Sequence, residues 1–234
     1  MRINTPQGPY RFKPVFLYPG RKVVDREIAM ENLRLLQKRM DEAGIPLLPV
    51  FGSLLGVVRD RAIIPWDEDI DLAVSYRDEQ KLLSLLWTLR EDGLELVRYD
   101  KRGLYSVMRK GEYIDFYIFQ PVEGHPRVWY SIYNEFQLQR HLEQTKPYDF
   151  QGIPIRIPED YDGCLTAYFG DWRTPVKYFD YAPSAWRKGV MRVKAWSKTL
   201  VPKAWYPALI RRMQRRPLEA FIGKCRERIS EEGL

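Results

Sequence analysis

Apolar residues recur at helical spacing along two stretches of this chain and fill short runs along several others. The helical spacing predicts helices over 23–44 and 77–91. Short apolar runs predict strands over 45–51, 70–74, 94–99, 104–109, 113–120 and 150–158. Shorter helices are expected over 53–61 and 159–169, and the polar stretch 100–103 predicts a hairpin turn. We see no internal repeat, and the length of 234 residues suits a single core with an appendage.

The two ends of the chain differ from this pattern. Prolines punctuate residues 1–20, which excludes a helix there and predicts an irregular arm. Near the other end, Trp and Val residues recur at helical spacing among Lys and Arg over 186–200, and the basic bias continues over 208–216. We therefore expect an arm over 1–22, a central domain over 23–182 and a basic amphipathic helical tail over 183–234.

The stretch 51–74 carries the clearest chemistry. Asp69 and Asp71 stand two apart at a predicted strand, so their side chains point to one face while Ile70 and Leu72 point to the core. Neighbouring carboxylates repel each other unless a cation lies between them. Mg²⁺ prefers such oxygens and binds one or two carboxylates together with substrate phosphates. The pair therefore indicates a metal site, although an isolated Asp-x-Asp is more often an ordinary surface feature.

Gly52 and Ser53 lie at the other end of this stretch, where a predicted strand gives way to a helix. Glycine permits a close backbone approach and serine caps helices. The exposed N–H groups of a helix start also favour a phosphate. A phosphate cradle beside a metal-binding pair of carboxylates indicates phosphoryl transfer.

Asp115 is a single acid within the otherwise apolar run 113–120. A buried carboxylate without a partner is costly, so its presence requires a reason. It is either an edge-strand residue paired with an arginine or a third carboxylate of the same site.

These motifs resemble the LicD/fukutin family of phosphotransferases, which belongs to the nucleotidyltransferase fold of DNA polymerase β. The family pattern is Gly-Ser/Thr-Leu-Leu-Gly ending in arginine, then Ile-Pro-Trp and an acidic run ending in Asp-x-Asp. This chain matches it at Gly52, Ser53, Leu54, Leu55, Gly56, Val58, Arg59, Ile64, Pro65, Trp66, Asp67, Glu68, Asp69 and Asp71. A looser match follows at 168–175, so the resemblance covers 23–175.

The resemblance implies an α/β (α+β) fold, a nucleotidyltransferase-like mixed and twisted sheet with helices mainly on one face. It makes 23–182 the LicD-type catalytic domain. It also implies a phosphotransferase that moves phosphocholine, glycerol phosphate or ribitol phosphate from a CDP-alcohol donor to a hydroxyl of a cell-surface glycan or lipid-linked glycan, with release of CMP. Two alternatives remain open: a nucleotidyltransferase that adds NMP from an NTP, and a non-catalytic membrane-associated adaptor of the same fold.

The resemblance also assigns roles to residues. Since the superfamily places a third acid on a neighbouring strand, the acids expected to be catalytic and to bind Mg²⁺ or Mn²⁺ are Asp69, Asp71 and Asp115. The residues expected to bind the donor phosphates are Gly52, Ser53 and Arg59, the last through its bidentate fork. Residues expected to support this loop or the metal are Trp66, Asp67 and Glu68.

Charge is concentrated in one segment. The net charge is +7, yet 186–216 alone contains ten Lys and Arg and no acid, so the remaining chain is slightly acidic. Tryptophan with Lys and Arg on an amphipathic helix is typical of a segment that binds an anionic membrane surface. Packing of the helix on the catalytic body is the main alternative, and nucleic acid is not expected as a partner.

The cysteines and the lengths of the apolar runs indicate the cellular compartment of the protein. Cys164 and Cys225 stand alone without metal-ligand spacing, which argues against a disulfide framework and for a reducing environment. The first residues show no apolar signal segment, and no 18-residue apolar run occurs. We expect a cytoplasmic protein, peripheral on the inner face of the cytoplasmic membrane.

Overall fold

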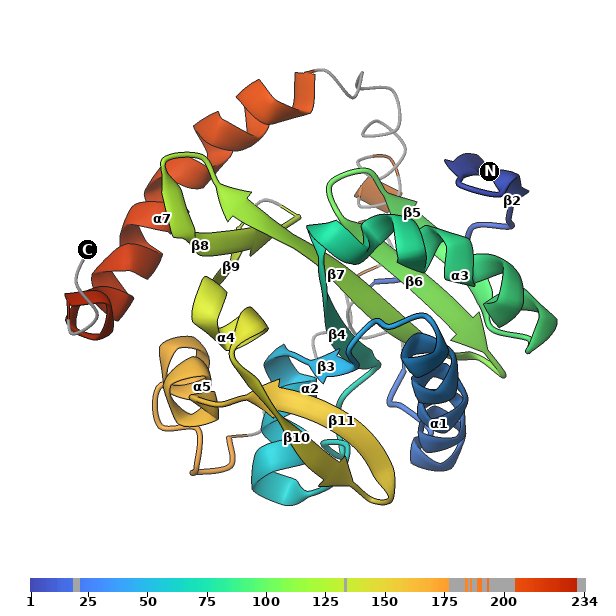
Figure 1. Cartoon of the computed structure of the whole chain (residues 1–234), viewed down its shortest axis with the longest axis horizontal. Helices are drawn as coiled ribbons and strands as arrows, with labels where there is room; N and C mark the ends of the chain where they lie inside the picture. The colour runs from blue at the N-terminus through green and yellow to red at the C-terminus, as the bar shows by residue number, and fades with distance from the viewer. Residues whose placement is uncertain are drawn as a thin grey trace.

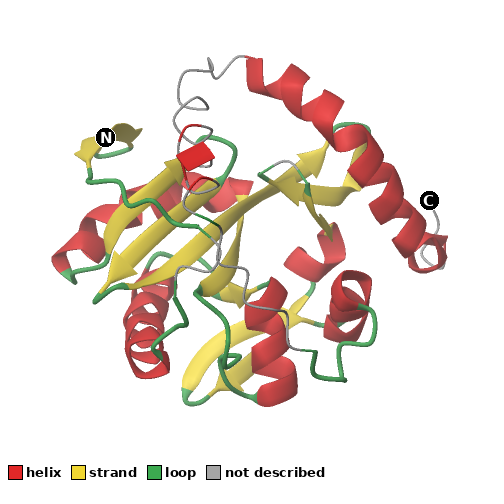
Figure 2. Cartoon of the chain, turned by 180° about the vertical axis from the view of Figure 1, so that it is seen from behind, coloured by secondary structure: helices red, strands yellow, loops and turns green. Residues whose placement is uncertain are grey.

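The computed structural model describes residues 1–18, 22–132, 134–176 and 205–230, together with 184, 186, 189, 190 and 193. Within these residues, a seven-stranded mixed sheet forms the centre of the molecule (Figures 1 and 2). Its strands are β3 (Leu48–Pro49), β4 (Ile70–Ser75), β5 (Glu95–Asp100), β6 (Leu104–Arg109), β7 (Glu112–Val122), β8 (His125–Ser131) and β9 (Glu135–Leu138). The strand order is β3-β4-β7-β6-β5, and β8 joins β7 to β9.

Helices and two hairpins surround this sheet. The helices are α1 (Arg26–Glu42), α2 (Phe51–Leu55), a π-helical turn η1 (Gly56–Asp60), a 3₁₀ turn η2 (Tyr76–Asp78), α3 (Glu79–Glu91), α4 (Gln139–Glu143), α5 (Tyr161–Phe169) and α7 (Tyr206–Ser230). The hairpins are β1 (Arg2–Thr5) with β2 (Gly8–Arg11), and β10 (Thr145–Phe150) with β11 (Ile153–Pro158). The helices α1 and α3 cover the same face of the sheet, in front in Figure 1 and behind in Figure 2.

The pairing of β4 with β7 decides which side chains face these helices. The two strands run parallel, whereas β3, β6 and β5 pair antiparallel with their neighbours. Leu72 and Phe116 are paired residues that are fully buried in the core, together with Leu36 of α1 and Leu86 of α3. Because strand residues alternate between faces, the neighbours of Leu72 and Phe116 point to the opposite side of the sheet. That opposite side holds the candidate site.

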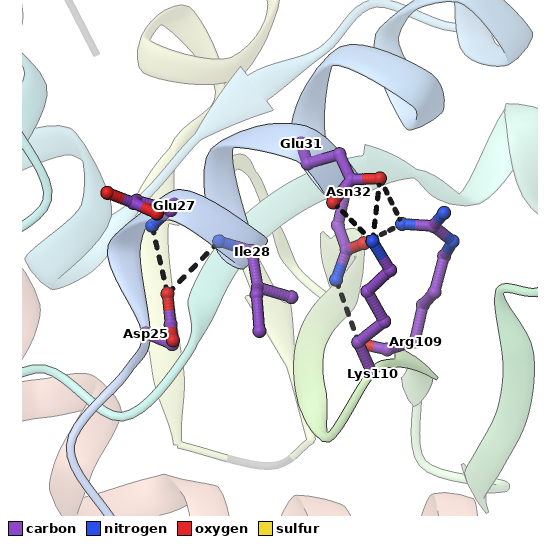
Figure 3. A network of polar contacts seen from close by, with 7 residues as sticks. All are labelled: Asp25, Glu27, Ile28, Glu31, Asn32, Arg109 and Lys110. Carbon is purple, nitrogen blue, oxygen red and sulfur yellow. Dashed lines mark hydrogen bonds and ion pairs between the residues drawn. The ribbon is translucent and has the colours of Figure 1, made fainter.

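Polar contacts attach α1 to the turn between β6 and β7 (Figure 3). Asp25 is the N-cap, and its Oδ1 accepts hydrogen bonds from two backbone N–H groups of the first turn. Asn32 is buried, donates to the carbonyl of Arg109 at 3.0 Å and accepts from the Arg109 guanidinium at 3.1 Å. Glu31 binds the side chains of Arg109 and Lys110. These contacts fix the helix to the end of β6 and to the turn that precedes β7.

The expected fold class is confirmed, since the sheet is mixed and its main helices lie on one face. The predicted strands 70–74, 94–99, 104–109 and 113–120 correspond to β4, β5, β6 and β7 within a few residues. The predicted strand 45–51 is wrong in extent, because only Leu48 and Pro49 join the ladder and α2 begins at Phe51. Residues 124–150 gave no clear prediction and contain β8, β9, α4 and β10.

The irregular arm expected over 1–22 is also wrong in part. Residues 2–11 form a hairpin in which Pro9 pairs with Asn4, because proline excludes a helix but tolerates an edge position in a two-stranded ladder. Tyr10 is fully buried and packs edge-on against Trp87 of α3, with ring centroids 5.2 Å apart. Val15 then donates its N–H to the carbonyl of Val97 in β5 at 2.9 Å. The first residues therefore belong to the folded core.

The helix α7 packs on the body along β8 and β9 (Figure 1). Its apolar side is formed by Leu218, Phe221, Ile222 and Cys225, and the Phe221 ring lies 5.7 Å from that of Phe136 in β9. Residues 208–216 are the first part of this single helix, and within them Ile210 and Gln214 are buried. Most of 186–200 lies outside the described residues. Among the described helices, none has the combination of length and apolar character that membrane spanning demands.

Candidate active site

Four strands carry polar residues at matching positions. Asp71 of β4 pairs with Asp115 of β7, which pairs in turn with Ser106 of β6. Ser106 pairs with Arg98 of β5. Because directly paired residues point to the same face, the four side chains form one row across the sheet, opposite α1 and α3.

Asp69 completes an acidic trio with Asp71 and Asp115. One carboxylate oxygen of each acid lies within 4.8 Å of the other two. Asp69 stands two residues before Asp71 and therefore points to the same side. Tyr113, two residues before Asp115 on β7, is hydrogen-bonded to the Asp69 carboxylate. The trio is thus built from one end of two parallel strands.

The charges of the trio are not balanced by the protein alone. Burial, and then the charge of Asp115, raises the pKa of Asp69 to about 8. Burial and the two neighbouring acids raise the pKa of Asp71 well above its usual range. In the described part of the structure, the buried Oδ1 of Asp115 has no hydrogen-bond partner. A divalent cation would relieve the repulsion between the carboxylates and would coordinate the buried oxygen that lacks a hydrogen bond. These residues can therefore hold a metal ion.

Arg98 binds the other oxygen of Asp115. Its Nη2 donates to Asp115 Oδ2, and its Nε donates to Ser106 Oγ at 2.7 Å. Burial raises the pKa of Asp115, and the guanidinium of Arg98 opposes that rise. Asp115 therefore has an arginine partner, as the first of our two interpretations predicted. It also lies among the acids of the site, as the second interpretation predicted. The edge-strand position is wrong, because β7 lies between β4 and β6.

The start of α2 lies against the trio. Ser53 Oγ accepts a hydrogen bond from the backbone N–H of Asp71 at 2.8 Å. Gly52 lies beside Asp67, since a Cβ on Gly52 would stand 3.2 Å from Asp67 Oδ2. Burial, and then the charge of Glu68, raises the pKa of Asp67 to about 6. The structure thus brings the Gly-Ser pair and a fourth carboxylate next to the three acids.

The backbone around α2 is strained and closely packed. Phe51 has φ 51°, a left-handed conformation that a bulky residue rarely adopts. Its ring packs edge-on against Tyr117 of β7 with centroids 4.9 Å apart. At Gly56, where α2 passes into the π-helical turn, a Cβ would stand 2.6 Å from the carbonyl oxygen of Ala62. The second glycine of the motif therefore serves backbone packing.

Other predicted residues make contacts outside the trio. Arg59 pairs with Asp60 at 2.8 Å, and its Nη1 donates to the carbonyl of Trp172 at 3.4 Å. Its charge lowers the pKa of Asp67, against the effect of burial. Trp66 is half-buried and packs against the main core. The guanidinium that we expected to bind a phosphate is thus engaged with its own neighbours in this structure.

Three residues of the site were not predicted: Arg98, Ser106 and Tyr113. The observed hairpin places Arg98 opposite Ser106, whereas the predicted loop 100–103 would place Arg98 opposite Tyr105. Tyr113 was identifiable because it shares a strand face with Asp115.

Residues 44–160 match the family model described as LicD/FKTN/FKRP, nucleotidyltransferase domain. An uncharacterized protein of Rickettsia typhi is 28% identical over 123 residues, which are 52% of this chain and 38% of that protein. The Mus musculus protein named Ribitol-5-phosphate transferase FKTN is 22% identical over 193 residues, 76% of this chain and 41% of that protein. The chain thus spans less than half the length of these curated relatives.

Among solved structures, the crystal structure of ANT(2")-Ia in complex with adenylyl-2"-tobramycin is similar, with a TM-score of 0.42 and 14% sequence identity. The similarity covers 85% of this chain and 98% of that chain. The family model spans half of the chain and includes α2, β4 and β7, which carry the Gly-Ser pair and the acidic trio. The chain therefore belongs to the LicD/FKTN/FKRP nucleotidyltransferase-domain family.

Proposed function

We propose that this protein is a metal-dependent phosphotransferase that moves a phospho-alcohol from a CDP-alcohol donor to a hydroxyl of a glycan or lipid-linked glycan. The observation that carries the proposal is the trio of Asp69, Asp71 and Asp115 beside the Gly-Ser pair of α2. Family membership supports the transfer of a phosphoryl group. The name of the mouse relatives, ribitol-5-phosphate transferase, favours ribitol phosphate over phosphocholine or glycerol phosphate.

Each residue has a distinct part in this proposal. Mg²⁺ or Mn²⁺ held by the trio would offset the charge of the donor diphosphate and of the departing CMP. The Ser53 hydroxyl already accepts the N–H of Asp71, so its hydrogen remains available to donate to a donor phosphate. Gly52 leaves the backbone free of a side chain at the same place. Arg98 holds one oxygen of Asp115, which directs the other oxygen toward the trio.

The proposed transfer exchanges one P–O bond for another. The acceptor hydroxyl oxygen forms a bond to the phosphorus that carries the alcohol, and the bond from that phosphorus to the bridging oxygen breaks. CMP leaves with the bridging oxygen, and the hydroxyl proton passes to a carboxylate or to water. The product is a phosphodiester-decorated sugar.

Product analysis of the full chain tests this proposal. We expect CMP release from CDP-ribitol, CDP-glycerol or CDP-choline with Mg²⁺, and its loss in Asp71→Asn. The matched control is Glu31→Gln, an acid-to-amide change on the exposed side of α1. Pyrophosphate release from an NTP would favour the alternative of nucleotidyl transfer. No turnover of either kind, without Mn²⁺ binding, would favour the non-catalytic adaptor.

The boundaries 23–182 for the catalytic domain and 183–234 for the tail remain our proposal, as does attachment of 186–216 to an anionic membrane surface. Exposed tryptophans support the attachment, since Trp186 is 77% and Trp205 is 69% exposed. Arg212 and Arg216 are exposed on α7. Each basic residue near such a surface contributes about 1 kcal/mol, enough in combination for reversible binding at the inner face of the cytoplasmic membrane.

A further inference from the structure

A groove of about 210 Å³ lies between α7, β9 and α5, and none of the three acids of the trio lines it. Its lining combines the half-buried rings of Tyr168 and Phe221 with the polar side chains of Glu135 and Lys224, and it includes the buried Phe136. Aromatic faces next to hydrogen-bonding groups suit a ligand with an apolar ring face and polar edges. A saccharide ring has this character.

Some polar atoms of the groove are available for hydrogen bonds with a ligand. Tyr168 donates its hydroxyl hydrogen to Glu135 Oε2 at 2.7 Å. Within the described residues, no hydrogen bond engages Glu135 Oε1, and no ion pair engages the exposed ammonium of Lys224. A carboxylate oxygen accepts from hydroxyls, and an ammonium donates to them. The groove therefore offers both an acceptor and a donor to a hydroxylated ring.

Tyr168 connects the groove to the trio. Its ring lies 4.9 Å from the ring of Phe51, the residue that precedes Gly52. The Phe51 ring in turn lies 4.9 Å from that of Tyr117, two residues after Asp115 on β7. A ligand in the groove is thus separated from the catalytic acids by a layer of aromatic rings.

We propose that this groove binds one sugar ring of the acceptor glycan, separated from the acids that bind the donor by the rings of Phe51 and Tyr117. The inference rests on the proposed function, because it names the acceptor subsite of that reaction. A volume of this size is smaller than that of pockets for drug-sized ligands and suits a single ring. Phe221 and Lys224 of α7 line the groove, so this helix would contribute to acceptor binding.

The test is binding of simple glycosides, detected by saturation-transfer NMR on the full chain with Mg²⁺ and CMP. The probes are methyl glycosides of glucose, galactose, mannose and N-acetylglucosamine. Ala220 is an exposed groove residue on α7, so Ala220→Trp fills the groove without touching the trio. The matched control is Glu219→Trp, the neighbouring exposed position outside the groove lining. We expect glycoside binding in the wild type and in the control, weakened by about tenfold or more in Ala220→Trp.

A second variant guards against an indirect effect of the bulky tryptophan. Glu135→Gln keeps the side-chain shape and removes the carboxylate, and we expect it to weaken glycoside binding while leaving Mn²⁺ affinity unchanged. Failure of all four glycosides to bind, or binding that survives both groove variants, would overturn the inference. Displacement of CMP by Ala220→Trp would instead assign the groove to the donor and also overturn it. Failure of the proposed function is distinguishable, because it appears as absence of CMP release while glycoside binding remains measurable.

Discussion

Asp71 and Asp115 are direct partners in the parallel ladder between β4 and β7. Adjacent strands in a sheet lie about 4.8 Å apart, so the pairing forces two carboxylates into proximity on one face. Asp69 adds a third from just outside the ladder. The folded protein therefore holds three carboxylates close together on one face of the sheet. Most of the properties that we expect of the site follow from the repulsion between them.

The metal-free protein should lose stability as the pH rises from about 4 to about 8. The pKa of Asp69 is 3.8 in an unfolded chain and about 8 in the folded protein, so the folded state keeps a proton that the unfolded state releases. This contribution is complete below the unfolded pKa and is lost as the pH passes the folded value. Thermal unfolding in EDTA across this range measures the slope.

Two comparisons make this pH dependence specific. Asp69→Asn should flatten the slope, whereas Glu91→Gln, a change at an exposed acid at the end of α3, should leave it unchanged. Mg²⁺ or Mn²⁺ should raise the melting temperature more at about pH 8 than at about pH 6, because the metal replaces protons on the carboxylates. A slope that is identical in Asp69→Asn and wild type would contradict the assignment.

Arg98→Met should destabilise the fold by about 3 kcal/mol, because it leaves the buried Asp115 without its partner. Asp115 is 2% exposed, so water does not replace the lost interaction. Arg215→Met is the control, since its ion pair with Glu219 is on the surface and should contribute less than about 1 kcal/mol. Urea unfolding of both variants measures the difference, and equal values would argue against a buried pair.

The two glycines of the motif should respond differently to alanine. In Gly56→Ala the new Cβ meets a backbone carbonyl at 2.6 Å, so the packing must shift at a cost of about 1–3 kcal/mol. In Gly52→Ala the nearest atom is a side-chain oxygen of Asp67 at 3.2 Å, so stability should change little while turnover falls. Urea unfolding and CMP release together check this. Equal destabilisation by both changes would contradict it.

The double variant Arg212→Glu/Arg216→Glu should abolish flotation with anionic vesicles, since each basic residue removed loses about 1 kcal/mol of attraction. The control Lys13→Glu/Lys101→Glu changes the net charge equally at exposed positions outside the tail. Vesicles of neutral phosphatidylcholine and vesicles with about 30% phosphatidylserine separate charge from hydrophobic adsorption. Wild-type protein that stays unbound with anionic vesicles would reject the membrane proposal.

The sequence allowed prediction of the central strands and of the trio, for local reasons. Asp69 and Asp71 lie two apart on one strand, and Asp115 interrupts an apolar run, so each signal lies within a few residues. Arg98 and Ser106 were missed because their role depends on strand pairing across the sheet. Arg59 was expected to face the phosphates, yet the π-helical turn places it on Asp60 and Trp172.

The ends of the chain were harder to predict, because tertiary contacts determine them. The prolines near the N-terminus correctly excluded a helix but gave no sign that Tyr10 would be buried against Trp87. In α7, the side formed by Leu218, Phe221, Ile222 and Cys225 recurs at helical spacing, but that spacing does not identify the surface that covers it. Its burial depends on the apolar surface of β8 and β9, a region whose pattern was not informative.

The central claim is that Asp69, Asp71 and Asp115 together hold a divalent cation. The most direct measurement is anomalous diffraction from a crystal of the full chain soaked with Mn²⁺ and a CDP-alcohol. We predict a manganese peak bonded to oxygens of these three acids, beside Ser53 and the donor diphosphate. A map with no peak among the three carboxylates, or with manganese bound elsewhere only, would contradict the account.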